Sequence, residues 1–552
     1  MLRFSSRVFA SLPLFVFVLV FSIPAALAQS PRIINENRLD YGGASTIDRR
    51  TRIPRPRDVE TPQNRVDDNS PRVVLQKLEL SGSTLSQRTV NEFWSHWQGK
   101  RISQAGMGRV ADDLKKTYSE NDYALYGVTI PPQDFARGIL RLEVTEGYIG
   151  AVGFEGDMMG DLSLARAFAE KLKTERPLRR STFQRYMLLM GDIPGLRIQP
   201  RFLPMNKDKG VVKLQIALTK RPVELGLTYN NQGAETLARS QFDSRLSFNS
   251  VLRQGDYTEF GYGFPDDFER YSLLSFFHEQ PVNSEGTRAS VFYSRLHTNP
   301  NDFQEGQSYS AGAQITHPLL RSKTDNIIAN IAVDGLNNDN AILGQTIADE
   351  RTRVLRAGFS GDHTDKKGNF TGGFLNISRG FNILGARQSV FFGDPNFTKG
   401  NIRIDHDHAL PLRFIGRIRS AAQVTAETLP SSEQLTFGGN DFGGGFEISR
   451  FAADRGVVGA GELAYPLDRF IKTRFINFPE IYGFADYGYL TNLDKAALGP
   501  PQEASSAGIG TRFGVTDKLA VQLQAGKAIS TPSFFSDDEK GWRYFMQIRT
   551  VF

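Results

Sequence analysis

Cysteine is absent from this chain of 552 residues. A chain without cysteine has no disulfide framework, no thiol chemistry and no thiolate metal ligands. The formal net charge of +6 is small for this length and does not indicate a nucleic-acid partner. Neither a Gly-x-Ser-x-Gly elbow nor a His-Glu-x-x-His helix occurs. We therefore expect no enzyme, no cofactor and no nucleic acid.

Long apolar runs are also missing after residue 28, where no stretch approaches the roughly 18 residues of a membrane-spanning helix. If the mature chain enters a membrane, it must do so as a closed β-barrel, because only helices and barrels satisfy every backbone polar group in lipid. The composition fits a barrel, with 52 Gly, 41 Phe and a mean hydropathy of −0.34. A polar lumen dilutes the lipid-facing residues in such a fold.

Residues 1–28 have the pattern of a secretory signal peptide. Arg3 and Arg7 precede an apolar stretch, and Ala26-Leu27-Ala28 precedes Gln29. This pattern predicts cleavage between Ala28 and Gln29. An uncleaved anchor is the alternative, because the apolar stretch is nearly long enough to span a bilayer. Residues 29–71 are polar and rich in Arg and Pro, which predicts a flexible linker with room for one short plug helix near 33–41.

Two similar units follow, at 72–147 and 148–221. Each reads as a strand, two helices and two strands, which indicates a tandem repeat of small α+β domains of about 75 residues. Helices are expected at 86–97 and 103–121 in the first unit, with Ser103 as the N-cap, and at 163–173 and 181–190 in the second.

Residues 222–552 alternate between apolar and polar positions, strand after strand. The first predicted strand starts at Val223, and similar segments begin near 240, 256, 271, 287, 307, 326, 351, 369, 400, 415, 457, 481, 505, 519 and 542. About sixteen strands is an even number, as expected for a bacterial single-chain barrel. A large soluble β-sandwich or propeller is the alternative for this region.

The last strand supports the barrel. Counting back in twos from Phe552 to Trp542 gives a largely apolar and aromatic row, whereas the other face, including Arg549 and Gln547, is mixed. Such alternation is typical of one face in lipid and one in a polar lumen. A half-buried strand of a soluble sheet would show the same pattern.

Two motifs resemble known families. The first, whose members are Gly138, Leu140, Leu142, Val144, Glu146, Gly147 and Ile149, resembles the junction between two POTRA domains. In the second, Phe484, Asp486 and Gly488 resemble the inner-wall Phe-x-Asp-x-Gly strand of the BamA-like superfamily, and period 2 places all three toward the lumen. The resemblance implies an antiparallel transmembrane β-barrel of about 16 strands, preceded by two POTRA domains.

In that superfamily the wall strand meets a loop with a Val-Arg-Gly-Phe tip. The loop here is predicted at about 437–456, with Gly443, Gly444, Gly445 and Phe446 at the tip, so glycines stand where Val-Arg is expected. A wall carboxylate without water is costly unless a partner such as a guanidinium compensates it. We hypothesise that Arg450 or Arg455 reaches Asp486 instead. Otherwise Asp486 faces lumen water.

The whole of 72–552 resembles the TpsB transporters of two-partner (type Vb) secretion, the ShlB/FhaC-like family. The resemblance implies a Gram-negative outer-membrane protein that contacts lipid and has periplasmic POTRA domains. They would recognise a large β-helical exoprotein (TpsA-type), and the pore would secrete it. The resemblance also implies that the cell's barrel-assembly machinery reads the terminal strand, with Tyr544 and Phe552 as the insertion signal.

Two other functions remain open at this point. A BamA/TamA-like assembly factor would share the barrel motifs but would normally carry more POTRA domains. A general or polysaccharide export porin leaves the POTRA pair and the loop unexplained. Asp405-His-Asp-His408 predicts no metal site, because on a strand its histidines and aspartates face opposite sides. The glycine-rich tip precedes no helix and predicts no nucleotide site.

Overall fold

The computed structural model describes residues 72–135, 137–158, 160–206, 209–388, 393–471, 473, 475–494, 499–515, 518–532 and 541–552. The predicted signal peptide, its cleavage at Ala28–Gln29 and the linker 29–71 lie outside these residues. No helix within the described ranges is both long and apolar enough to cross a membrane.

The first α+β unit packs two helices on a small sheet. Its elements are β1 (Val73–Val74), β2 (Lys77–Ser81), α2 (Gln87–Ser95), β3 (Arg101–Ile102), α3 (Gln104–Glu120), β4 (Tyr126–Thr129) and β5 (Ile139–Glu146). The sheet order is β2-β5-β4. Ser103 caps α3 as predicted, since its hydroxyl accepts a hydrogen bond from the backbone N–H of Gly106 at 3.3 Å.

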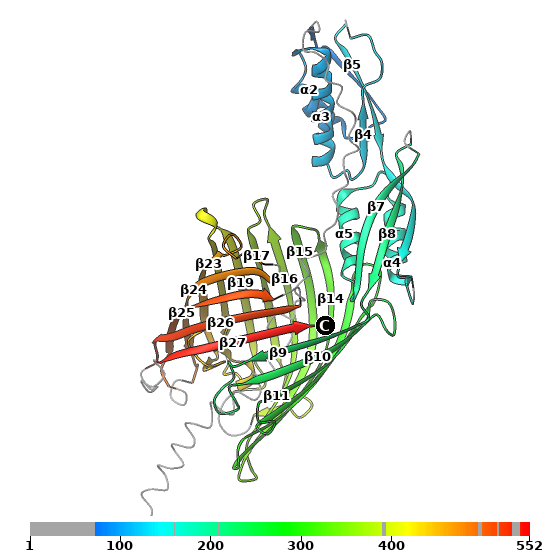
Figure 1. The fold of residues 1–552 in the computed structure, drawn as a ribbon. Helices are drawn as coiled ribbons and strands as arrows, with labels where there is room; N and C mark the ends of the chain where they lie inside the picture. The colour runs from blue at the N-terminus through cyan, green and yellow to red at the C-terminus, as the bar shows by residue number, and fades with distance from the viewer. Residues whose placement is uncertain are drawn as a thin grey trace, which may run out of the picture.

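The second unit repeats this plan. Its elements are β6 (Tyr148–Gly156), α4 (Ser163–Thr174), α5 (Arg180–Gly191), β7 (Leu196–Asn206) and β8 (Val211–Lys220). The sheet order β6-β8-β7, with β6 parallel to β8, matches that of the first unit. Figure 1 shows the two units following one another at one end of the barrel.

The rest of the described chain forms a closed antiparallel barrel, so the predicted fold class is confirmed. Its sixteen wall strands are β9 (Val223–Asn230), β10 (Gln241–Asn249), β11 (Tyr257–Pro265), β12 (Tyr271–Pro281), β13 (Arg288–Asn301), β14 (Gln304–Arg321), β15 (Asp325–Ile342), β16 (Gln345–Thr364), β17 (Phe370–Gly380), β19 (Thr398–Ala409), β20 (Ile415–Thr425), β23 (Arg455–Pro466), β24 (Ile476–Thr491), β25 (Gln502–Val515), β26 (Leu519–Ser530) and β27 (Trp542–Val551). The short β18 (Arg387–Gln388) pairs with β16, and η2 (Pro411–Arg413) precedes β20.

The terminal strand closes the barrel. β27 pairs with β9 from Gln547 opposite Asn230 to Val551 opposite Gly226. Tyr544 is 71% exposed on the outer face, whereas its neighbour Phe545 is 8% exposed and points inward. The predicted alternation of this strand between lipid and lumen is therefore confirmed.

The second α+β unit is attached to the barrel by ionic contacts. Glu285, in the turn between β12 and β13, pairs with Lys171 of α4 at 2.7 Å (Nζ to Oε1) and accepts a hydrogen bond from the Tyr186 hydroxyl of α5 at 2.9 Å. Arg321, at the end of β14, donates two hydrogen bonds to the Asp192 carboxylate, at 2.8 and 2.7 Å. These contacts orient the unit on the rim from which β9 starts.

Glu285 makes this attachment sensitive to pH. The hydrogen bond from Lys171 holds the pKa of the Glu285 carboxyl below its usual value, although partial burial acts in the opposite direction. Because the folded pKa is depressed, the stabilising contribution is present above the usual glutamate value of about 4.3 and is lost as the pH falls through the folded pKa.

We expect acidification through this window to loosen the contact of α4 and α5 with the barrel. Hydrogen exchange of α5 in the purified full-length protein should rise as the pH falls, after correction for intrinsic exchange. In Glu285→Gln the contact should already be weaker at neutral pH, and the part of the pH response due to Glu285 should disappear. Identical pH profiles for the two proteins would contradict this role.

Candidate functional site

The connection between β20 and β23, residues 426–454, folds into the barrel lumen. β20 runs in the same direction as β9, so this connection starts at the rim away from the α+β units. It contains η3 (Ser431–Glu433), β21 (Leu435–Phe437) and β22 (Phe451–Ala453), and the two strands pair with each other. We call residues 426–454 the lumen loop.

The lumen loop has its own aromatic core. The rings of Phe446 and Phe451 lie 5.0 Å apart between centroids, and both pack against Phe437 at 5.8 and 6.2 Å. All three side chains are buried in a cluster that also includes Leu490 of the wall. The hairpin and the tip therefore pack as one body inside the barrel.

The tip of the loop is bound to the wall through backbone groups. The N–H of Gly444 donates a hydrogen bond to Asp486 Oδ2 at 2.7 Å, and the N–H of Gly445 donates to Ser506 Oγ at 3.1 Å. Ser506 in turn donates to Asp486 Oδ2 at 2.8 Å, and Gln524 Nε2 donates to the carbonyl oxygen of Gly444 at 3.0 Å. Asp486 is 7% exposed, and the N–H of Gly444 and the hydroxyl of Ser506 compensate its burial; in the described part of the chain no cation donates a hydrogen bond to it.

The short distance between the loop tip and the wall explains why glycines occupy the tip. A Cβ on Gly444 would lie 2.6 Å from Gln524 Nε2 and 2.7 Å from the Phe484 ring, and one on Gly445 would lie 2.7 Å from the carbonyl carbon of Lys527. The facing wall residue Gly526 also has no room for a side chain, since a Cβ there would lie 2.3 Å from the oxygen of Gly444. Backbone N–H groups can approach Asp486 only because both surfaces lack side chains here.

The hypothesis that Arg450 or Arg455 reaches Asp486 is wrong in this structure. Among the described residues, Asp486 receives hydrogen bonds from Gly444 and Ser506, and neither arginine pairs with it. Arg455 is the first residue of β23 and is exposed on the outer face, opposite to the lumen face of Asp486. Arg450 directly precedes β22, and its backbone nitrogen and Cβ lie next to Gly438. Nor does Asp486 face open lumen water, because it is buried under the tip.

The wall motif lies where period 2 places it. Phe484, Asp486 and Gly488 share the lumen face of β24, and Phe484 flanks Gly444. A Cβ on Gly488 would lie 2.7 Å from the Phe437 ring, so this glycine makes room for the aromatic core of the loop. The loop-tip residues and the wall motif are therefore in direct contact.

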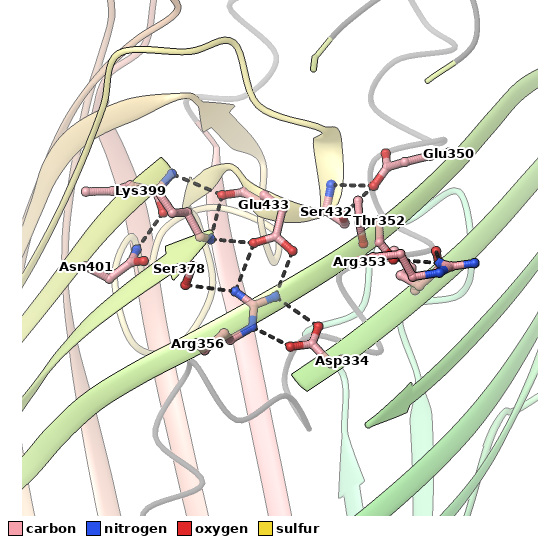
Figure 2. A network of polar contacts seen from close by, with 12 residues as sticks. Asp334, Glu350, Thr352, Arg353, Arg356, Ser378, Lys399, Asn401, Ser432 and Glu433 are labelled. Carbon is pink, nitrogen blue, oxygen red and sulfur yellow. Dashed lines mark hydrogen bonds and ion pairs between the residues drawn. The ribbon is translucent and has the colours of Figure 1, made fainter. Parts of the chain in front are cut away.

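A second contact region holds the start of the lumen loop, and sequence reasoning missed it. Glu433 of η3 accepts hydrogen bonds from Arg356 of β16 at 3.1 and 2.8 Å and pairs with Lys399 of β19 at 2.8 Å (Nζ to Oε2). Arg356 also donates to Asp334 of β15 at 2.6 and 3.0 Å and to Ser378 of β17 at 3.1 Å. Figure 2 shows Arg356 between the two carboxylates. Alternation predicts that these wall residues face the lumen, but not that they meet a loop residue.

The POTRA-like junction motif has a structural role between the two α+β units. Glu146 accepts hydrogen bonds from the N–H and hydroxyl of Thr84 at 2.7 and 2.6 Å and from the Tyr118 hydroxyl at 2.8 Å. Gly138 has φ +70°, and a Cβ there would meet the oxygen of Val74 at 2.2 Å. The apolar members Leu140, Leu142, Val144 and Ile149 are buried, and Gly147 donates to the oxygen of Leu125 at 2.8 Å.

Asp405-His-Asp-His408 lies on β19, where the rings of His406 and His408 stack at 5.7 Å on one face. Among the described residues, no group of three or more His, Asp or Glu side chains gathers in a way that could hold a metal ion.

Comparison with known proteins gives two family matches. Residues 209–513 match the haemolysin secretion/activation protein family ShlB/FhaC/HecB, and residues 73–147 match the ShlB-type POTRA domain. The chain is 19% identical to the heme/hemopexin transporter protein HuxB of Haemophilus influenzae strain 86-028NP, over 87% of this chain and 88% of that protein. It is 22% identical to the outer membrane transporter CdiB-2 of Burkholderia pseudomallei strain 1026b, over 80% of this chain and 78% of that protein.

A solved structure supports the fold. The structure of CdiB from Escherichia coli superimposes with a TM-score of 0.73 at 17% identity, covering 96% of this chain and 98% of that one.

We expect Gly526→Ala to displace the tip of the lumen loop, because the new methyl group would overlap the oxygen of Gly444. Loss of the tip contacts should raise the leak of ions and hydrophilic antibiotics through the barrel severalfold, measured in whole cells and in planar bilayers. Asp486→Ala should have the same effect, whereas Asp486→Asn keeps an acceptor oxygen and should leak less.

Gly461→Ala is the matched control. Gly461 lies on β23, and a Cβ there would have no heavy atom nearer than 4.0 Å. Its leak should equal that of the wild type. If Gly526→Ala inserts normally and leaks no more than Gly461→Ala, the tip is not what closes this side of the lumen.

Proposed function

The chain belongs to the haemolysin secretion/activation protein family ShlB/FhaC/HecB, and from that premise we propose that its lumen loop must leave the wall for cargo to pass. As a member of this family it is an outer-membrane translocator of two-partner secretion, which recognises an exoprotein in the periplasm and secretes it through its barrel. The observation that carries the proposal is the lumen loop, which contacts the wall at both β15–β19 and β24–β26.

The cargo is a large exoprotein of the TpsA type, and the two α+β units capture it. We assign these units as POTRA domains at 72–147 and 148–221, ahead of the barrel at 222–552, as the sequence predicts. Each sheet leaves two edge strands, β2 and β4 in the first and β6 and β7 in the second. An unfolded segment adds to such an edge through backbone hydrogen bonds.

The edge strand β7 is the best candidate for this capture. It pairs only with β8 among the described strands, and its end carries the exposed side chains of Leu203 and Met205. An extended cargo segment placed there would gain both backbone hydrogen bonds and apolar contact.

Transport needs no chemical step in this proposal. Neither ATP nor a proton gradient is available at the outer membrane, so folding of the cargo outside the cell supplies the drive. The protein accordingly acts without catalysis, metal or cofactor.

Tyr544 and Phe552 serve assembly in this proposal. Tyr544 is exposed on β27, the strand that closes the barrel against β9, and the exposed Phe552 directly follows that strand. The barrel-assembly machinery reads this strand and inserts the barrel into outer-membrane lipid.

Deletion of the gene tests the function directly. We expect one large surface or secreted protein to disappear, while the amounts of other outer-membrane barrels stay unchanged in quantitative proteomics of membrane and medium. Plasmid-borne wild type should restore the cargo, and a form lacking residues 72–221 should insert less well or fail to export it. A general fall in barrel proteins would instead indicate an assembly factor and overturn the proposal.

A further inference from the structure

We propose that Glu433 is the positioning residue of the transport cycle, because it anchors the root of the lumen loop to the wall while the rest of the loop swings away. The root comprises residues 429–434 and Asp454, and the swinging body comprises residues 435–453. The inference rests on the proposed function, in which the lumen loop must move for cargo to pass.

The root is held by charges that have no access to solvent. The side chains of Arg356, Asp334, Glu433 and Lys399 are at most 2% exposed. Among the described residues, the cations of Arg356 and Lys399 contact the carboxylates of Asp334 and Glu433 across β15, β16, β19 and the loop. The buried carboxylate of Glu350, on β16, accepts hydrogen bonds from the root residues Ser431 and Ser432 beside them. Withdrawal of Glu433 would take from Arg356 and Lys399 the carboxylate that both contact, in a site closed to solvent, which is far more costly than the loss of an exposed pair. Detachment of the root from the wall therefore has a high free-energy cost.

Hydrogen bonds join both ends of the loop at the same place. Gln423 of β20 donates to the backbone oxygens of Glu433 at 3.1 Å and of Asp454 at 2.8 Å. The Asp454 carboxylate accepts hydrogen bonds from the N–H of Leu429 at 2.9 Å and of Leu493 at 2.8 Å. The two chain ends of the body are thus fixed side by side, as a pivot requires.

The contacts of the body are of a different kind. At the tip, Gly444 and Gly445 use only backbone groups, which water can replace when the lumen opens. Ion pairs also link the body to the wall: Asp441 pairs with Arg403 at 2.9 Å and with Arg419 at 3.7 Å, and Glu447 pairs with Arg543 at 3.0 Å. The side chains in these pairs keep some solvent access, so their separation leaves no charge in a dry site.

The aromatic core keeps the body together as it moves. Phe437, Phe446 and Phe451 pack on one another, and these ring contacts can persist in a swing about the root. The swing separates them only from the wall residues of the same cluster, such as Leu490 and Ala504. In the resembled superfamily the loop tip supplies an arginine and the wall supplies a carboxylate. Here the ionic contact lies at the root instead, where the loop supplies the carboxylate of Glu433 and the wall supplies Arg356.

A charge-balance experiment tests the anchor. Glu433→Gln removes the carboxylate that Arg356 and Lys399 share, and Lys399→Met removes one of the two cations that Glu433 contacts. Each single variant should raise pore leak severalfold in planar bilayers and in cells that lack the cargo. The double variant leaves the balanced Arg356–Asp334 pair, so its leak should return toward the wild-type level.

Glu480→Gln is the matched control, since Glu480 pairs with Arg417 and Arg512, which are wall residues and not part of the lumen loop. Its leak should be unchanged. Migration in gels with and without heating shows whether each barrel is folded. The inference fails if folded Glu433→Gln does not leak, or if the double variant leaks as much as the worse single variant.

A tether tests the swing even if the charge variants do not fold. The chain has no cysteine of its own, so a Phe437→Cys/Gly488→Cys pair can form only one disulfide. A Cβ on Gly488 would lie 2.8 Å from Phe437 Cγ, which brings the pair near the Cβ–Cβ spacing of about 3.5–4.5 Å that disulfides need. The oxidised protein should lose secretion and the reduced protein should regain it.

Normal secretion by the oxidised double-cysteine variant would contradict the proposal that the body swings away from the wall. Leak is measured without cargo, so it tests the anchor whether or not the protein exports a partner. If deletion of the gene leaves every exoprotein in place, the proposed function is wrong. The leak of the Glu433 and Lys399 variants then still tests the anchor independently.

Discussion

The buried pairing of Glu433 with Arg356 and Lys399 determines where the lumen loop enters the barrel. A carboxylate in a site without water must keep its cations, and these come from wall strands that the β-ladder already holds in register. Once the root is fixed there, the remaining loop reaches the opposite wall, where its backbone meets Asp486. The lumen loop thus spans the interior of the barrel from the Glu433 site to Asp486.

The wall can hold the lumen loop in place because the backbone polar groups of its strands are already hydrogen-bonded to one another. Pairing of β27 with β9 closes the ladder, as a barrel in lipid requires, and leaves alternate side chains free to face the lumen. Small residues then set how near the loop can come, with Gly488 and Gly526 under Phe437 and Gly444. At the periplasmic rim, Glu285 and Arg321 hold the second α+β unit against the same strands.

Much of this fold could be predicted from the sequence, because strand alternation and helix capping are local. The number of strands, the Ser103 cap and the lumen face of Asp486 follow from period and spacing. The strand starts follow less closely, since β16 begins at Gln345 rather than near 351 and β24 at Ile476 rather than near 481. The partner of Asp486 could not be predicted, since a search for a replacement arginine looks for a side chain and the structure uses the N–H of Gly444. The Glu433 cluster was missed for another reason: its members come from η3, β15, β16 and β19, and only the closed barrel brings them together.

The most direct test of the account is the single-channel conductance of the purified protein with the body of the lumen loop removed. Deletion of residues 436–452 leaves both root segments, and Leu435 and Ala453 already lie opposite each other in β21 and β22. The account predicts low, intermittent conductance for the full chain and a large, steady conductance for the deletion variant. Equal conductance from two correctly folded proteins would show that the loop does not close the pore, and would contradict the account.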